Sequence, residues 1–178
     1  MCPSIETLSG SPFVETIRIE KGRIHNLPYH NARMNRTRRS YSERGKKLIS
    51  QVIFIRGSSR TYQMPGGIYP RGLKGRIRSL PYASGSFLAI GTCDEIDYSY
   101  KSTDRQCLND LFAQRAGHDD ILIIRDGLLT DTSICNVALW NGTSWITPAR
   151  PLLCGTMRAY LLDKGLVQAG DIPGRGYA

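Results

Sequence analysis

Alternating apolar and polar residues mark the first readable segment of the chain. The stretch "FVETIRI" at 13–19 alternates well enough for a β-strand, and the turn "EKG" leads into "RIHN", so a hairpin is predicted. From Pro28 the spacing becomes helical in "PYHNARMNRTRRSY", with proline near the first turn, a narrow apolar face and a basic polar face. Residues 42–92 hold short runs such as "LISQVIFIRG", "GGIYPRGLKGRIRSL" and "SGSFLAIG", separated by Gly, Pro and Ser. Strands are expected there, but periodicity does not order them into a sheet.

The second half of the chain carries stronger signals. In "KSTDRQCLNDLFAQRAG", Thr103 and Gln106 form a capping box, apolar residues follow at helical spacing, and Gly117 ends the predicted helix. The segments "ILIIRDGLLTDTS" and "NVALWNGTSWITP" are predicted hairpins because each contains an Asp-Gly or Asn-Gly dipeptide. A last helix, "GTMRAYLLDKG", is expected to end at Gly165. The class predicted from these elements is α+β, without internal repeats.

Length and composition limit the type of protein. The chain has 178 residues, of which 40% are hydrophobic, enough for one sizeable core or two small lobes. Its longest apolar runs are far shorter than the roughly 20 residues of a membrane span, and its start shows no secretory signal, so a cytoplasmic protein without a membrane partner is expected. The five cysteines are scattered without a C-x-x-C pair, which predicts reduced thiols and no metal site.

The net charge of +9 is concentrated in the first half, where 33–47, "RMNRTRRSYSERGKK", contains a single acid. Such a charge suits nucleic acid, a membrane surface or an anionic small molecule. A basic helix face is most often simply solvated, and phosphate binding is the next interpretation. Because no helix-turn-helix or finger pattern is present, nucleic acid is not predicted as a partner.

Lys101 is the first candidate for chemistry. It is predicted to end an extended segment immediately before a helix start, where the helix dipole and partial burial favour a neutral amine. A neutral lysine amine is what Schiff-base chemistry requires. A lysine at such a joint is usually a surface residue, so other features must point to the same chemistry.

Three further features do so. Gly155 and Thr156 begin a helix, which offers N–H groups to an anion. Arg33 on the basic helix has a guanidinium suited to a bidentate phosphate contact, and Asp131 is an acid in a segment otherwise suited to burial, so it needs a cationic partner or a strand end in water. Each has an ordinary role as a cap or a solvated charge. Together with Lys101 they make up the components of a pyridoxal-phosphate (PLP) site.

Two segments in the first part of the chain carry a family resemblance. The string "ETIRIEKGRIHNLPYHNARMNR" resembles the N-terminal hairpin and helix of the fold-type IV PLP enzymes, the class IV aminotransferases and aminodeoxychorismate lyases. Their His-x-x-Arg pair, which supplies the phosphate-binding arginine, matches His30 and Arg33. The string "YKSTDR" resembles the segment with the Schiff-base lysine, which implies this role for Lys101.

Two later segments complete the resemblance. The string "LLTDTSICNVALW" is similar to the family's T-E-x-S-x-x-N-V strand, so Asp131 stands where a glutamate faces the pyridine nitrogen. Aspartate is shorter than that glutamate by one methylene. Ser133, Asn136 and Val137 are in step with the same pattern, and Ser133 is implied to bind the cofactor. The string "TPARPLLCGTMR" resembles the phosphate loop, which implies phosphate binding by Gly155 and Thr156, followed by Arg158.

The resemblance implies a two-lobed fold like that of D-amino acid aminotransferase. A small N-terminal α/β lobe is expected at 1–92 and a larger β-rich lobe, shortened at its C-terminus, at 93–178. The implied cofactor is pyridoxal 5'-phosphate, the substrate an amino acid or a similar small amine, and the assembly a homodimer. An aminotransferase is the first expectation and a 4-amino-4-deoxychorismate lyase the alternative. A non-catalytic relic or a basic binding protein is the third hypothesis.

Overall fold

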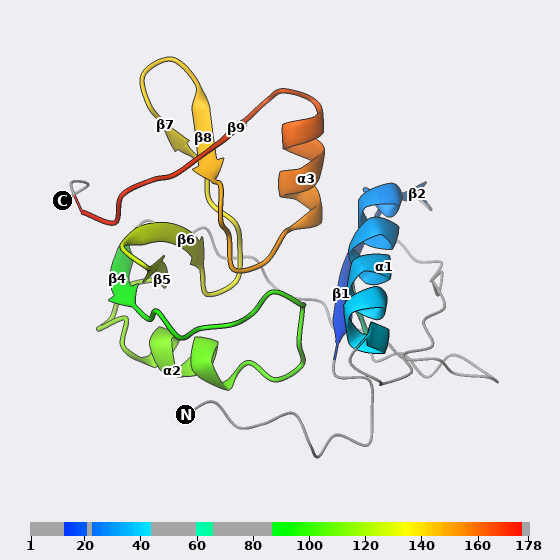
Figure 1. Ribbon diagram of the computed structural model, residues 1–178, viewed down its shortest axis with the longest axis horizontal. Coiled ribbons are helices and arrows are strands. Elements are labelled where there is room, and N and C mark those ends of the chain that lie inside the picture. The colour runs from blue at the N-terminus through cyan, green and yellow to red at the C-terminus, as the bar shows by residue number, and fades with distance from the viewer. Residues whose placement is uncertain (1–12, 21–22, 44–59, 66–86, 176–178) are drawn as a thin grey trace. The chain divides into compact units, whose positions relative to one another are not determined.

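The computed structural model describes residues 13–20, 23–43, 60–65 and 87–175 (Figure 1), and the chain divides into two compact units. The first unit is Met1–Tyr82 with Tyr100–Asp104, and the second is Ala83–Ser99 with Arg105–Ala178. The short segment with Lys101 therefore belongs to the first unit. The lobes expected at 1–92 and 93–178 remain a prediction.

The first unit contains the predicted hairpin and the predicted basic helix. Its strands form a sheet in the order β2-β1-β3, and both pairings are antiparallel. The elements are β1 (Val14–Glu20), β2 (Arg23–Ile24), β3 (Arg60–Pro65) and α1 (Leu27–Glu43). Strand β3 was not predicted, and the expected strands "LISQVIFIRG" and "GGIYPRGLKGRIRSL" lie outside the described residues.

The buried face of α1 is polar. His30, Arg33 and Thr37 are buried at a spacing of three and four residues, so they form one stripe along the helix. The alternation along β1 places Glu15 and Ile17 in the interior as well. The apolar face of α1 is narrow because ionic and hydrogen-bonding groups occupy its buried positions.

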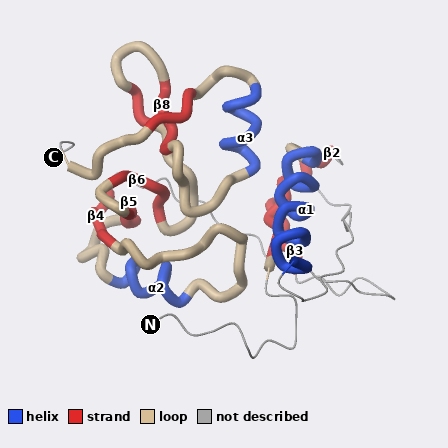
Figure 2. Tube along the Cα trace, viewed as in Figure 1, coloured by secondary structure: helices blue, strands red, loops and turns tan. Residues whose placement is uncertain are grey.

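The described residues of the second unit form two three-stranded sheets and two helices (Figure 2). In the first sheet β4 (Leu88–Thr92) runs parallel to β5 (Asp120–Arg125), and β6 (Leu128–Thr132) runs antiparallel to β5. The second sheet contains β7 (Leu139–Trp140), β8 (Trp145–Pro148) and β9 (Gln168–Gly170), and the helices are α2 (Gln106–Ala113) and α3 (Thr156–Asp163). Both predicted hairpins are confirmed. Strand β9 was not predicted.

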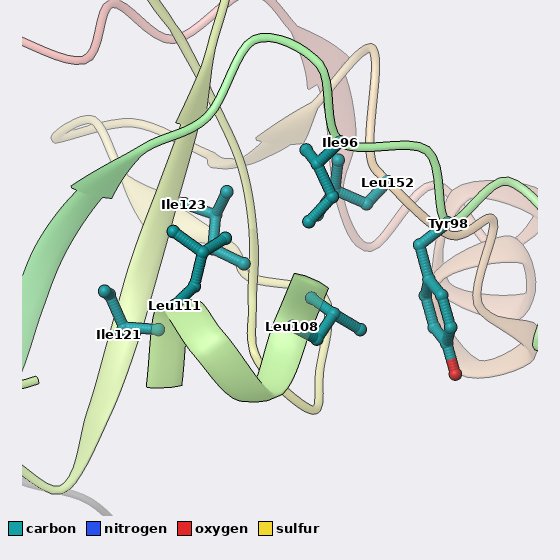
Figure 3. Close-up of a cluster of buried hydrophobic side chains, with 7 residues drawn as sticks. All are labelled: Ile96, Tyr98, Leu108, Leu111, Ile121, Ile123 and Leu152. Atoms are coloured by element: carbon teal, nitrogen blue, oxygen red, sulfur yellow. The ribbon is translucent and has the colours of Figure 1, made fainter. Parts of the chain in front are cut away.

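Helix α2 covers one face of the β4-β5-β6 sheet. Leu108 and Leu111 of α2 pack in one buried cluster with Ile121 and Ile123 of β5 (Figure 3). The remaining members of this cluster are Ile96, Tyr98 and Leu152. A second cluster lies around Ile124, Leu129 and Ile172, with partly buried residues of β7 and β8 against it. Strands β5 and β6 are thus fixed by apolar packing, which gives the loop after β6 a rigid base.

The start of α2 differs from the prediction, whereas the start and the end of α3 agree with it. Arg105 is the N-cap of α2 and no side-chain hydrogen bond caps this helix, so the capping box predicted at Thr103 is wrong. Gln106 instead donates from its side-chain amide to Asp110 at 2.7 Å. Helix α3 ends before Gly165, whose φ of +66° and the 2.9 Å bond from Leu166 N–H to the Leu161 carbonyl form a Schellman-type end.

Candidate functional site

The six predicted site residues are divided between the two units. Arg33 and Lys101 belong to the first unit. Asp131, Ser133, Gly155 and Thr156 belong to the second unit. Each unit presents its own set of groups, and each set is described by itself.

The Asp131 carboxylate is buried in β6 and held at both oxygens. Asp131 is only 4% exposed. Asn136 donates from Nδ2 to Oδ1 at 2.7 Å, and the Leu153 backbone N–H donates to Oδ2 at 2.9 Å. Burial raises the pKa of Asp131 to about 6, because these hydrogen bonds and the charge of Arg158 offset only part of the desolvation. Among the described residues no cation forms an ion pair with this carboxylate.

Asn136 connects the carboxylate to the start of α3. The same Nδ2 donates to the Leu153 carbonyl at 2.7 Å, and Leu153 is two residues before Gly155. Gly155 is the N-cap of α3, and no side-chain hydrogen bond caps this helix. The carboxylate of Asp131 and a helix N-terminus, which favours anions, are therefore parts of one local structure.

Ser133 is fixed by hydrogen bonds to both of its peptide groups. Its N–H donates to Asp120 Oδ1 at 3.3 Å, and its carbonyl accepts from Arg105 Nη2 at 2.7 Å. Arg105 also donates from Nη1 to the Tyr98 hydroxyl at 2.9 Å. No local sequence pattern predicts these roles of Arg105 and Asp120, since their partners lie 28 and 13 positions away.

Lys101 lies in a loop of the first unit. It is half-buried, and the next residue, Ser102, forms an antiparallel bridge with Phe13. Because α2 begins at Gln106, Lys101 precedes the helix by five positions. The prediction that Lys101 stands immediately before a helix start is therefore wrong. The aromatic ring of Phe13 also contacts Tyr100 edge-on, with 6.0 Å between ring centroids, which packs the chain beside Lys101.

The Arg33 guanidinium is buried and paired with Glu15. Nε donates to Glu15 Oε1 at 2.8 Å and Nη2 to Oε2 at 2.5 Å. His30 Nδ1 is 2.7 Å from Oε2, and it carries a proton there because an ionised carboxylate can only accept. The bidentate contact expected with a phosphate is thus made with a carboxylate. A phosphate contact by Arg33 would use Nη1 or the second hydrogen of Nη2.

Glu15 was not among the predicted residues, although its position carried a signal. It shares the alternation of Phe13 and Ile17, so an acid stood in the apolar phase of the strand. Burial would raise the pKa of Glu15, but hydrogen bonds and charges from His30 and Arg33 hold it below its usual value. Glu15 is therefore ionised at neutral pH and neutralises the buried guanidinium.

We expect replacement of Glu15 by glutamine to destabilise the first unit. The change leaves the Arg33 charge buried without its counter-charge, which costs about 3 kcal/mol or more of unfolding free energy. Urea unfolding at pH 7, followed by far-UV circular dichroism, measures this loss. The exposed Glu95 provides the matched control, Glu95→Gln, with little expected effect. A Glu15→Gln variant as stable as this control would contradict the prediction.

Three relatives show how this chain compares with known proteins. It is 34% identical to an uncharacterised protein of Haemophilus influenzae over 172 residues, covering 90% of this chain and 88% of that protein. A crystal structure of a proposed 4-amino-4-deoxychorismate lyase from Haemophilus somnus matches with a TM-score of 0.77 and 30% identity, covering 94% of this chain and 90% of the other. A shorter stretch of 55 residues is 49% identical to the aminodeoxychorismate lyase of Saccharomyces cerevisiae, covering 27% of this chain and 15% of that enzyme.

The family model for amino-transferase class IV matches residues 97–173. The chain belongs to the class IV aminotransferase family. The matched range includes Lys101, Asp131 and Ser133, together with Gly155 and Thr156, whereas Arg33 lies before it. The expected family and the α+β fold of fold type IV are therefore confirmed. The two Haemophilus proteins are covered almost end to end, so they share the short length of this chain.

The class IV aminotransferase family depends on PLP, and one structure of the same fold, an aminotransferase from Brucella abortus, is bound to PLP. It matches with a TM-score of 0.60 and 14% identity, covering 93% of this chain and 73% of the other. The residues of the second unit fit this cofactor chemically. Asp131 is a buried acceptor that forms no ion pair with any described residue, and a protonated pyridine nitrogen would supply the missing partner. The start of α3 offers N–H groups of the kind that bind phosphates.

Other site types have no support in the described part of the chain. No group of three or more His, Cys, Asp or Glu residues there is arranged to hold a metal ion. Cys93, Cys107, Cys135 and Cys154 are free thiols. Nor does any helix among the described residues combine the length and apolar character that a membrane crossing demands.

The raised pKa of Asp131 predicts a pH dependence of stability. Its folded pKa of about 6 exceeds its ordinary value of 3.8, so folding binds a proton and this stabilisation disappears as the pH rises through 6. Lowering the pH from 7.5 to 5 should therefore stabilise the cofactor-free protein by about 1.4 kcal/mol through this group. The lowered pKa of Glu15 has the opposite effect, because its stabilisation is lost as the pH falls below its ordinary pKa of 4.5.

Urea unfolding at the two pH values, compared with Asp131→Asn, isolates this contribution. The asparagine does not titrate, so the variant should lack the gain. Equal pH dependence in both proteins would contradict the assignment.

Proposed function

We propose that this protein is a PLP-dependent enzyme that acts on an amino acid or a similar amine. The observation that carries this proposal is the buried Asp131 carboxylate, which is held at both oxygens beside a helix start and forms no ion pair with any described residue. The membership of the family supports it. When bound, PLP supplies an electron sink for the bonding electrons released at the reacting carbon of the substrate.

Lys101 is the proposed catalytic residue. With PLP bound, its amine would hold the cofactor and, once free, would take and return the proton at the reacting carbon of the substrate. Asp131 would hold the ring nitrogen of the cofactor, and its negative charge would favour the protonated form of that nitrogen. The hydrogen bonds from Asn136 and Leu153 orient the carboxylate for this contact.

The phosphate group is assigned to the start of α3. Gly155 and Thr156 supply the N-terminal end of the helix, where the dipole favours an anion, and Thr156 adds a hydroxyl. Ser133 contributes from the loop after β6, whose backbone Asp120 and Arg105 hold. Arg33 is proposed to assist through the N–H groups of Nη1 and Nη2 that Glu15 does not use.

Within this chemistry we propose a 4-amino-4-deoxychorismate lyase as the specific activity. The Haemophilus somnus and yeast proteins, both at least 30% identical over their matched regions, carry this activity in their descriptions. The reaction splits one substrate molecule into pyruvate and 4-aminobenzoate, without a second substrate and without net oxidation. The second candidate is an aminotransferase, which the family description favours and which would use the same residues.

Two assays on the PLP-incubated protein distinguish these activities. A lyase releases pyruvate and 4-aminobenzoate in equal amounts from 4-amino-4-deoxychorismate, and the cofactor returns unchanged. An aminotransferase converts the bound cofactor to its amine form when an amino donor alone is added, and amino transfer to a 2-oxo acid restores it. A folded protein that binds no PLP would reject both activities and support the non-catalytic hypothesis.

A homodimer is proposed on the resemblance to the family. The second unit exposes several large apolar residues that a second copy could cover. They include Phe87, Leu88 and Ile90 beside or within β4, and Trp140 and Trp145 on the β7-β8 hairpin. Light scattering coupled to gel filtration measures the assembly, and a mass of one chain at micromolar concentration would reject the dimer.

A further inference from the structure

The Asn136 side chain joins three parts of the second unit. Its two amide hydrogens are used on two acceptors, Asp131 Oδ1 and the Leu153 carbonyl, both at 2.7 Å. Leu153 in turn donates its N–H to the other oxygen of Asp131 at 2.9 Å. Asn136, Leu153 and Asp131 therefore form a closed hydrogen-bonded ring, which links β6 to the segment before α3.

Besides Asp131 and Leu153, the Asn136 side chain lies against Gly155. A Cβ built on Gly155 would lie 1.9 Å from Asn136 Oδ1, which is closer than two such atoms can approach, and 3.1 Å from its Cγ, which is a tight contact. The φ of −67° and ψ of 148° at Gly155 are ordinary for any residue, so backbone conformation does not require glycine here. The requirement comes from the space that the Asn136 side chain occupies.

We infer that Asn136 is a positioning residue, which fixes the Asp131 carboxylate against the start of α3 and requires glycine at position 155. Its importance for catalysis rests on the proposed function, because Asp131 and Gly155 are the groups assigned to the ring nitrogen and the phosphate. The contact itself is a property of the cofactor-free chain.

The chemistry of the side chain explains why it is asparagine. Both acceptors are oxygens, so the residue must donate two hydrogen bonds from one nitrogen, which an amide can do. Aspartate at 136 would have no amide hydrogen to offer and would add a second negative charge beside Asp131. Alanine would remove the hydrogen bond from Asn136 to the Asp131 carboxylate and leave the one from the Leu153 N–H.

A double-mutant cycle in the cofactor-free protein tests the inference. The variants are Asn136→Ala, Gly155→Ala and their combination, with Asn109→Ala on the exposed side of α2 as the matched control. The readouts are the midpoint of urea unfolding and the pKa of Asp131. This pKa is measured by NMR from the chemical shift of the carboxyl carbon as the pH is changed. The charged and titratable groups that act on Asp131, Arg158 and Cys135, are left unchanged in all variants.

Asn136→Ala should raise the pKa of Asp131 by about one unit, because it removes a hydrogen bond to the charged form. Gly155→Ala should raise it in the same direction, since the new Cβ displaces Asn136, and should lower the unfolding midpoint. In the double variant the Cβ has room, so the second change should add no further shift to the pKa and no further loss of midpoint.

The opposite results would overturn the inference. The first is a pKa of Asp131 that is the same in Asn136→Ala as in the Asn109→Ala control. The second is a double variant in which the losses of unfolding midpoint from the two single changes add up. If Gly155→Ala alone fails to fold, folding of the double variant supports the contact and its failure rejects it. Because no readout uses PLP, a positive result with a protein that binds no PLP would refute the proposed function alone.

Discussion

Replacement of Lys101 by alanine is expected to lower kcat by about a thousandfold or more in whichever of the two reactions the protein catalyses. The variant loses both the amine that is proposed to hold the cofactor and the base that is proposed to move the substrate proton. Steady-state turnover with excess PLP measures the effect. Excess cofactor keeps the protein supplied with PLP. The loss of turnover then reflects chemistry at the reacting carbon and not only weaker retention of PLP.

The exposed Lys164 offers a matched control, because it is a lysine of the second unit without a proposed role. Lys164→Ala should keep its turnover within about twofold of the unchanged protein. The role of Lys101 would be rejected if Lys101→Ala retained turnover within tenfold of this control while its circular dichroism matched the unchanged protein.

Asp131→Asn is expected to lower kcat by about a hundredfold to a thousandfold, with a smaller effect on PLP affinity. The asparagine is nearly isosteric, but it carries no charge to keep the ring nitrogen protonated. Proton abstraction should then limit the rate more strongly. A substrate deuterated at the reacting carbon should show a larger isotope effect on kcat in the variant than in the unchanged protein.

A titration with PLP separates this effect from loss of the cofactor. Affinity should change by about tenfold or less, since the phosphate contacts at α3 remain. Undiminished turnover by Asp131→Asn would contradict the role of the charge, and a loss confined to PLP affinity would assign Asp131 to binding alone.

Local patterns predicted those elements whose signals are local. The hairpins and the helices α1 and α3 follow from alternation, helical spacing and turn residues close together in the chain. The capping box at Thr103 failed because the spacing was present but Arg105 took the N-cap position, while its guanidinium is engaged with Tyr98 and the Ser133 carbonyl. Strands β3 and β9 are short and pair with distant partners, which no periodicity reports.

The site was predicted only in part, because many of its contacts join residues that are distant in the sequence. The resemblance supplied Lys101 and Asp131, but not the residues that surround them. Glu15 lies 18 positions from Arg33, and Leu153 lies 22 positions from Asp131, so these contacts exist only in the folded chain. An acid in the apolar phase of β1 was the one sequence signal that could have revealed the buried Glu15.

The central claim is that Lys101 holds PLP, and borohydride reduction followed by peptide mapping tests it most directly. The protein is incubated with PLP, reduced, digested and examined by mass spectrometry, with Lys101→Ala treated in parallel. We predict a visible absorbance band that reduction abolishes and a pyridoxyl group on the peptide with Lys101, both absent from the variant. A folded protein without such a band, or one labelled equally in Lys101→Ala, would contradict the claim.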